Sequence, residues 1–233
     1  MRTFVGTSGY SYKEWKGSFY PEKLPASEML RYYAQRFSTV EINNTFYRMP
    51  KEQVVESWAG QVPDGFRFVL KASQRITHQK RLVNVEDDTS YLLHMASVLG
   101  ERQGPLLFQL PPNFKKDLSR LKAFLSLVEG RALTAFEFRH ESWFDDEVFE
   151  CLRASAGALC IADVDNAPEP TLTSTAGWGY LRLRRETYTD QDLAKWIEKL
   201  KSTGWQDVYV YFKHEDAGIG PKLATRFIEL AGC

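Results

Sequence analysis

Short apolar runs alternate with longer amphipathic stretches along the whole chain. Runs rich in Val, Leu, Ile, Phe and Tyr are typical of strands, and they occupy residues 3–6, 39–43, 66–71, 105–110, 134–139, 158–163, 180–184 and 208–213. Helix-like segments lie between most of them, at 27–37, 51–59, 89–100, 117–128, 145–156, 190–202 and 220–230. The stretch 164–177 is rich in Pro, Thr and Ser, and it predicts a loop where a helix would otherwise stand.

Strict alternation of strands and helices indicates a parallel sheet. Eight such units within 233 residues predict an α/β fold, a single-domain (β/α)8 TIM-type barrel over residues 1–233 whose sixth helix is short or missing. A doubly wound open sheet is the alternative. It favours a glycine-rich GxGxxG turn after the first strand, and the GTSG of residues 6–9 does not match. No repeat or linker divides the chain.

The stretch FEFRHESWF, residues 136–144, places two charges on one face of a predicted strand. Successive strand residues point to opposite faces, and the face of a barrel strand that meets the helices must be apolar. Phe136 and Phe138 therefore face the helices, while Glu137 and Arg139 face the interior. The same test turns inward Glu41, Asn43, Arg67, Val69, Lys71, Gln109, Tyr180, Arg182, Arg184, Tyr209, Tyr211 and Lys213, and we take Asp163 as a further inward residue.

The predicted interior is rich in positive charge although the whole chain is balanced, with 30 basic and 30 acidic residues. Six cations, namely Arg67, Lys71, Arg139, Arg182, Arg184 and Lys213, face the three anions Glu41, Glu137 and Asp163. An unpaired buried charge costs several kcal/mol, so we predict an anionic ligand at this place. The alternative is structural: Glu41, Glu137 and Asp163 would pair with Arg182, Arg139 and Lys71 to hold the barrel together.

Acid–base chemistry needs side chains whose pKa lies near neutrality. The candidate catalytic residues are Glu41, Glu137, His140, Lys71 and Asp163. Lys71 stands at a strand end among other cations, which predicts a lowered pKa and a role as base or amine nucleophile. The candidate substrate-binding residues are Arg139, Arg182, Arg184, Lys213, Tyr10, Trp15, Asn43, His78, Gln109, Trp143 and Tyr211.

Metal and cofactor signals are weak. His78, His140 and His214 follow strand ends, so a divalent metal is an alternative, but no HxH or HExxH spacing is present. We therefore predict no metal site and no cofactor. The chain also contains neither the GxSxG of serine hydrolases nor a phosphate-binding GxxxxGK[ST] loop.

Bulk composition predicts a soluble cytoplasmic protein without a membrane partner. Hydrophobic residues make up 43% and charged residues 26% of the chain. No apolar run approaches the roughly 20 residues of a membrane helix, and the first residues do not form a signal sequence. The three cysteines show no CxxC spacing, which fits a reducing compartment.

Several motifs together resemble the YecE-like family, domain of unknown function 72. They are GTSGYSYKEWKGSFYP, VEINNTFYRMP, FVLKASQRITH, LLFQLPPNF, FEFRHESWF, GYLRLR and VYVYFKH, and they span essentially the whole chain. The resemblance implies a TIM-type barrel and no established reaction. Its motif positions fall on Gly9, Tyr10, Trp15, Glu41, Asn43, Phe46, Tyr47, Lys71, His78, Gln109, Pro111, Pro112, Glu137, Arg139, His140, Ser142, Trp143, Asp163 and Arg182.

One position departs from the family pattern. Where many members read RLHG after the seventh strand, this chain reads RLRR, so that Arg184 stands in place of a histidine and Arg185 in place of a glycine. A role assigned to that histidine would fail in this chain, and the site gains charge.

Three hypotheses follow for function. The leading one is an enzyme with a basic, aromatic-rimmed pocket that acts on an anionic, phosphorylated or nucleotide-like small molecule by general acid–base chemistry. The second is a non-catalytic module that binds single-stranded nucleic acid or a protein partner through the aromatic loop 7–26. The third is a divalent-metal-dependent hydrolase or isomerase, by analogy with other barrels. The sequence leaves an oligomeric partner open.

Overall fold

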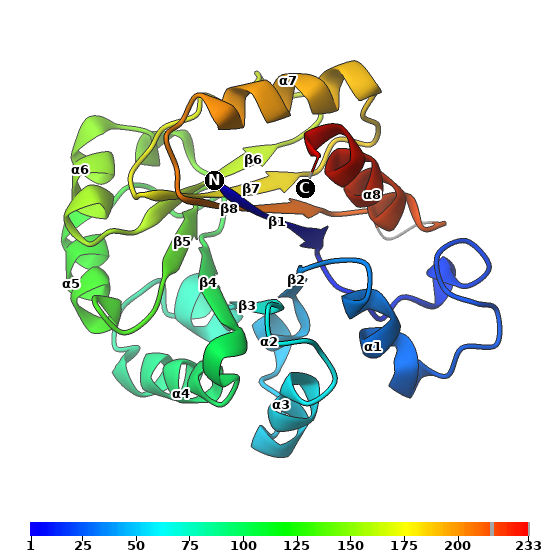
Figure 1. The fold of residues 1–233 in the computed structure, drawn as a ribbon. Helices are drawn as coiled ribbons and strands as arrows, with labels where there is room; N and C mark the ends of the chain where they lie inside the picture. Colours follow the sequence, from blue (N-terminus) through cyan, green and yellow to red (C-terminus); the bar gives the residue numbers. More distant parts are fainter. Residues whose placement is uncertain (215–216, 233) are drawn as a thin grey trace.

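Eight parallel strands form the centre of the molecule in the computed structural model, which describes residues 1–214 and 217–232. Cys233, one of the three cysteines, lies outside that range. The strands are β1 Arg2–Thr7, β2 Thr39–Ile42, β3 Arg67–Lys71, β4 Gln103–Gln109, β5 Thr134–Glu137, β6 Ala158–Asp163, β7 Trp178–Leu183 and β8 Asp207–Phe212. Neighbours along the chain are neighbours in the sheet from β2 to β8, and β1 pairs with β8 (Figure 1).

The two sheet ends, β1 and β2, meet at a narrow seam. Ser8 and Glu41 form a parallel bridge there, and the backbone N–H of Gly9 donates to the Glu41 carbonyl at 2.8 Å. Gly6 permits this approach because a Cβ at that position would lie 2.0 Å from the carbonyl oxygen of Thr39. The sheet is therefore a nearly closed barrel, and the predicted (β/α)8 TIM-type fold is confirmed.

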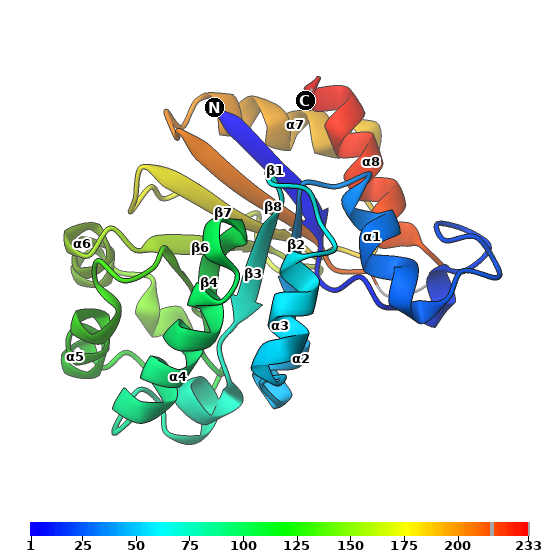
Figure 2. The ribbon, with the colours of Figure 1, turned by 60° about the horizontal axis from the view of Figure 1, so that its bottom comes forward.

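Helices cover the outside of the barrel (Figures 1 and 2). They are α1 Met29–Ala34, α2 Asn44–Tyr47, α3 Glu52–Ala59, α4 Glu86–Ser97, α5 Leu118–Val128, α6 Asp146–Ala154, α7 Asp190–Lys201 and α8 Ile219–Ala231. Single-turn helices occur at η1 Lys13–Trp15, η2 Ala26–Glu28, η3 Arg75–Gln79, η4 Gly100–Arg102 and η5 Glu141–Trp143. Residues 164–177, between β6 and β7, contain no helix, so the prediction that the helix after the sixth strand is short or missing is confirmed.

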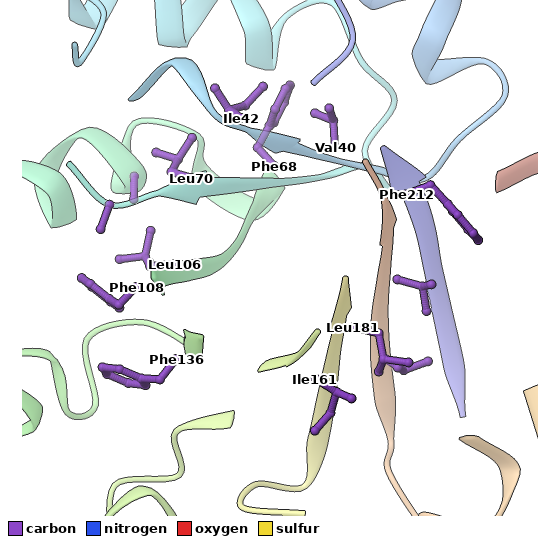
Figure 3. Close-up of a cluster of buried hydrophobic side chains, with 14 of the residues drawn as sticks. Val40, Ile42, Phe68, Leu70, Leu106, Phe108, Phe136, Ile161, Leu181 and Phe212 are labelled. Carbon is purple, nitrogen blue, oxygen red and sulfur yellow. The ribbon is translucent and has the colours of Figure 1, made fainter. Parts of the chain in front are cut away.

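The outer faces of the strands form one apolar layer beneath the helices. Val40, Ile42, Phe68, Leu70 and Phe136 lie in this layer and are each 4% exposed or less (Figure 3). Burial of such side chains contributes about 1.5–3 kcal/mol each. The alternation in the sequence predicted this face because the helices leave no room for polar groups there.

The inner faces of the strands divide the barrel into two parts. A second apolar cluster, which includes Val69, Leu107, Ala135 and Tyr209, fills the interior nearer the amino ends of the strands. Charged side chains begin above it, at the carboxyl ends, where the active sites of such barrels lie. The fold thus places a charged cluster directly on an apolar layer inside the barrel.

Candidate functional site

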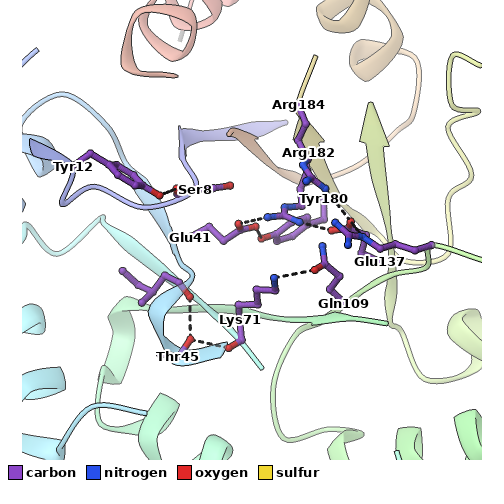
Figure 4. A network of polar contacts seen from close by, with 12 residues as sticks. Ser8, Tyr12, Glu41, Thr45, Lys71, Gln109, Glu137, Tyr180, Arg182 and Arg184 are labelled. Carbon is purple, nitrogen blue, oxygen red and sulfur yellow. Dashed lines mark hydrogen bonds and ion pairs between the residues drawn. The ribbon is translucent and has the colours of Figure 1, made fainter. Parts of the chain in front are cut away.

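Arg182 links opposite sides of the barrel. It points inward from β7, and its guanidinium donates to Glu41 Oε1 on β2 at 2.8 Å and to Glu137 Oε2 on β5 at 2.5 Å (Figure 4). The Tyr180 hydroxyl donates to Glu41 Oε2 at 2.6 Å. All four side chains are buried. The pairs Glu41–Arg182 and Glu137–Arg139, the latter at 3.4 Å, confirm two of the three ion pairs of the structural alternative.

Glu137 is the anion that the arginines share. Arg139 Nε lies 3.4 Å and Arg184 Nη1 lies 3.5 Å from its Oε1, in addition to the contact with Arg182. Burial alone would raise the pKa of Glu137, but the charges of Arg182, Arg184 and Arg139 lower that pKa to about 2. Glu137 is therefore ionised at neutral pH and cannot donate a proton there.

Lys71 ends β3 beside this network. Its Nζ donates to Gln109 Oε1 at 2.9 Å and lies 4.2 Å from the centroid of the Phe46 ring. Within residues 1–214 and 217–232, no carboxylate forms a salt bridge with Nζ. Burial, and then the charge of Arg182, lower the pKa of Lys71 from 10.5 to about 8. Lys71 can therefore change its charge close to physiological pH.

His78 approaches the same cluster from the single turn η3. Its ring packs edge-on against Phe46 at 4.9 Å between centroids, and its Nδ1 lies 2.8 Å from Thr77 Oγ1. Burial, followed by the charges of Lys71 and Arg139, lowers the pKa of His78. The imidazole is neutral at pH 7 and can accept a proton.

Positive charge exceeds negative charge at the carboxyl ends of the strands. Four cations, Lys71, Arg139, Arg182 and Arg184, surround the two carboxylates Glu41 and Glu137. Arg182 forms one salt bridge with each carboxylate through its two terminal nitrogens, whereas the Arg139 side chain is 35% exposed and reaches Glu137 only at 3.4 Å. We call Lys71, Arg139, Arg184 and His78 the outer cluster. All four groups interact electrostatically with Glu137, and their combined charge favours an anion.

Asp163 does not belong to this interior. It accepts hydrogen bonds from Arg185 Nε at 2.9 Å, Tyr188 OH at 3.0 Å and Trp196 Nε1 at 3.2 Å, and Trp196 belongs to α7. The inward residues of β6 include Ala158 and Cys160, so Asp163 shares the outward face. The prediction that Asp163 points inward and pairs with Lys71 is wrong. The Arg185 side chain lies on the outward side with Asp163, whereas the Arg184 side chain adds positive charge to the interior.

Three aromatic residues predicted at the rim lie instead within the packed structure. Trp143 stacks on Phe138 at 4.8 Å and donates from Nε1 to the Phe114 carbonyl at 2.6 Å. Trp15 packs 4.8 Å from Tyr12, and the hydroxyl of Tyr211 lies 2.7 Å from that of Thr39. Trp143, Trp15 and Tyr211 are fully buried, and core contacts use the rings of all three and the polar atoms of Trp143 and Tyr211. Their prediction as substrate-binding rim residues is wrong.

The remaining predicted residues lie around the cluster rather than within it. His140 Nδ1 accepts from the Ser142 backbone N–H at 3.1 Å and so caps η5. Tyr10 and Asn43 line a separate cavity of about 120 Å³. Lys213 directly follows β8 and is half-buried. The site residues selected from the sequence did not include Tyr180 and Phe46. Alternation along β7 already indicated that Tyr180 faces inward, and Phe46 lies in the motif VEINNTFYRMP.

Metal-ligand geometry and membrane-spanning helices are both absent from the described residues. Residues 1–214 and 217–232 contain no group of three or more His, Cys, Asp or Glu side chains placed to hold a metal ion. In the same residues, no helix combines the length and apolarity needed to cross a membrane.

Comparisons with known proteins place the chain in one family. A family model described as "Protein of unknown function DUF72" matches residues 4–233. UPF0759 protein YecE of Escherichia coli is 37% identical over 116 residues, which cover 49% of this chain and only 43% of YecE. UPF0759 protein YunF of Bacillus subtilis is 24% identical over 267 residues, which cover 97% of this chain and 94% of YunF.

Solved structures agree with the observed fold. The crystal structure of a DUF72 family protein from Thermotoga maritima is 25% identical, covers 100% of both chains and superposes with a TM-score of 0.81. One from Enterococcus faecalis is 20% identical, covers 99% of this chain and 96% of that one, and gives a TM-score of 0.84. The second likeness concerns the fold alone.

Proposed function

The chain belongs to the DUF72 family, and we propose that it is an enzyme acting on an anionic, phosphorylated or nucleotide-like small molecule at the carboxyl ends of the barrel strands. The observation that carries this proposal is the charge imbalance of the cluster, in which four cations surround only two carboxylates. Because a buried or half-buried charge without a partner is costly, a bound anion would complete the cluster. Arg139, Arg184 and Lys71 are its ligands.

Arg139 and Arg184 are suited to hold that anion. Their contacts with Glu137 Oε1, at 3.4 and 3.5 Å, are longer than the roughly 2.7–2.9 Å of a strong charge-assisted bond. Each guanidinium therefore keeps donors for a second partner. Planar guanidinium groups bind phosphate and carboxylate oxygens in pairs, which orients the substrate as well as attracting it.

Lys71 is the acid–base group of the proposal, with His78 beside it. A pKa of about 8 leaves Lys71 mostly protonated but able to exchange its proton at neutral pH. Glu137 is unsuited to this task because its pKa is about 2. Glu41 has both carboxylate oxygens engaged by Arg182 and Tyr180. The two carboxylates are positioning residues that fix Arg182.

The two alternative functions find less support in the described residues. A nucleic-acid module needs exposed rings for base stacking, and three of the four aromatic residues predicted to bind substrate, Trp15, Trp143 and Tyr211, are buried. A metal-dependent enzyme needs several ligands around one point, and the described part of the chain offers no such group. The charged cluster favours neither alternative over the small anionic substrate.

Calorimetric titration with inorganic phosphate and pyrophosphate tests the proposal. Replacing Arg139 and Arg184 together with Gln is expected to weaken binding by about tenfold or more, because two charge-assisted contacts are lost. The matched control is Arg131→Gln, which removes an exposed arginine that precedes β5 at the opposite end of the barrel. Absence of binding to the unmodified protein, or equal affinity in the double variant and the control, would contradict the proposal.

A further inference from the structure

We infer that Lys71 is an amine nucleophile that forms a Schiff base with a carbonyl compound bearing a nearby carboxylate or phosphate. This inference rests on the proposed function, since Arg139 and Arg184 must hold the anionic group. It narrows the substrate class to 2-oxo acids and phosphorylated ketoses or aldoses. The arrangement of Lys71, its neutral partners and the surrounding arginines carries the inference.

The backbone of Lys71 is firmly held, which fixes the origin of its side chain. Its carbonyl accepts from Thr45 Oγ1 at 2.7 Å, and the next N–H, of Ala72, donates to the Leu107 carbonyl at 2.9 Å. Thr45 belongs to α2, the short helix that also carries Phe46. The Lys71 amine is therefore presented from a rigid strand end, as a covalent catalyst requires.

The partners of the Lys71 amine distinguish it from other lysines of the chain. Lys80 contacts Asp88 at 2.7 Å and Lys116 contacts Asp145 at 2.6 Å, so an ionic partner retains the proton in each. Lys71 instead contacts a neutral amide, Gln109, and the face of a ring. When the Lys71 amine loses its proton, no salt bridge with a carboxylate is broken.

The surroundings of Lys71 favour the neutral amine. Burial and the charge of Arg182 lower its pKa to about 8, so a useful fraction is unprotonated at pH 7 to 8. A desolvated lysine beside another cation is a general means of activating an amine nucleophile. An anion drawn to Arg139 and Arg184 would bring an adjacent carbonyl carbon toward Nζ.

The proposed step balances without a further reactant. The Lys71 ammonium gives one proton to neutral His78, and the free amine attacks the carbonyl carbon while the carbonyl π pair moves to oxygen. A second proton passes from nitrogen to that oxygen, which gives the carbinolamine. The His78 proton then converts the hydroxyl into departing water as the C=N bond forms. The products are a protonated imine and one water, and Glu137 offsets the imine charge.

Borohydride trapping followed by mass spectrometry tests the inference, with pyruvate and dihydroxyacetone phosphate as probes. Reduction of the imine is expected to add to the protein the mass of the probe less one oxygen atom, and peptide mapping is expected to place the label on Lys71. Lys71→Arg keeps the charge but removes the primary amine, so it should abolish that label. Lys122→Arg, on the exposed side of α5, should leave it unchanged.

The outcomes separate this inference from the proposed function. Phosphate binding is measured on the same preparations. Intact phosphate binding with no label on Lys71 from either probe would overturn the inference and leave the proposed function standing. Failure of phosphate binding would overturn the function on which the inference rests. Labelling of surface lysines to the same extent as Lys71 would also overturn the inference.

Discussion

Burial and neighbouring charge oppose each other at Glu137. The side chain is 2% exposed, which by itself favours the neutral acid, yet three arginines keep it ionised. At Lys71 the same two influences act together, because burial and Arg182 both favour the neutral amine. One cluster thus contains a fixed anion and a titratable cation, as acid–base sites often do.

Replacing Glu137 with Gln tests the role of the fixed anion. The change leaves Arg182 with one carboxylate and Arg139 and Arg184 with none from Glu137, so we expect the free energy of unfolding to fall by about 3–5 kcal/mol at pH 7. Because the folded pKa of about 2 lies below the ordinary 4.5, this stability is present above 4.5 and is lost as pH falls toward 2.

Urea unfolding of the Glu137→Gln variant and the unmodified protein, repeated at several pH values, measures both effects. The difference between the two proteins should shrink as pH is lowered from about 5 to about 3. A difference that stays constant over this range would show that the charge of Glu137 is not what stabilises the fold.

Prediction from the sequence succeeded for individual residues where a strand has one plainly apolar face. Val40 and Ile42 place Glu41, and Phe136 and Phe138 place Glu137, because side chains alternate with a period of two. The strand ALCIAD, residues 158–163, is apolar on both faces, so its pattern does not fix the direction of Asp163. Glu137 lies closer to Arg182 than to the Arg139 that the sequence predicted as its partner, because no local pattern distinguishes the two arginines.

At the scale of elements, the segment after β5 shows what a local pattern leaves undetermined. The strand ends at Glu137, two residues earlier than the sequence predicted, and η5 follows at Glu141–Trp143. Trp143 returns to the core and stacks on Phe138. An aromatic residue after a strand has the same local signal whether it lines a pocket or fills the core. Only tertiary packing decides between the two.

Trp143→Phe tests whether Trp143 is a core residue. Loss of its hydrogen bond to the Phe114 carbonyl and of ring volume is expected to lower the free energy of unfolding by about 1–3 kcal/mol. Phosphate affinity should stay within about twofold, because Trp143 contributes no group to the outer cluster. Phe144→Leu, at a neighbour that is 54% exposed, is the control and should change stability by less than about 0.5 kcal/mol. A weaker phosphate affinity at unchanged stability would contradict this assignment.

At the scale of the whole molecule, the order of elements and the barrel fold were predictable from the sequence, but the contact that closes the barrel was not. Eight apolar runs separated by amphipathic segments determine a parallel sheet with helices outside. Closure depends on the approach of β1 to β2, where Gly6 meets the Thr39 carbonyl. A glycine within a strand has several possible meanings, and this one requires a partner more than thirty residues away.

Gly6→Ala tests closure of the barrel. Its Cβ would meet the Thr39 carbonyl oxygen at 2.0 Å, so the seam must open, and we expect a loss of about 3 kcal/mol or more in the free energy of unfolding. Gly65→Ala is the matched control, since its added Cβ would meet no atom within 4 Å and should change stability little. Equal stability of the two variants in thermal and urea unfolding would show that the seam is not tightly closed.

The pKa of Lys71, measured by NMR titration of its side chain with and without inorganic phosphate, tests the central claim most directly. The account predicts a pKa of about 8 in the free protein, because burial and Arg182 disfavour the ammonium. It also predicts that bound phosphate raises this pKa, since an anion held by Arg139 and Arg184 stabilises the positive charge of Lys71. A pKa near the ordinary 10.5 that phosphate leaves unchanged would contradict the proposed anion site.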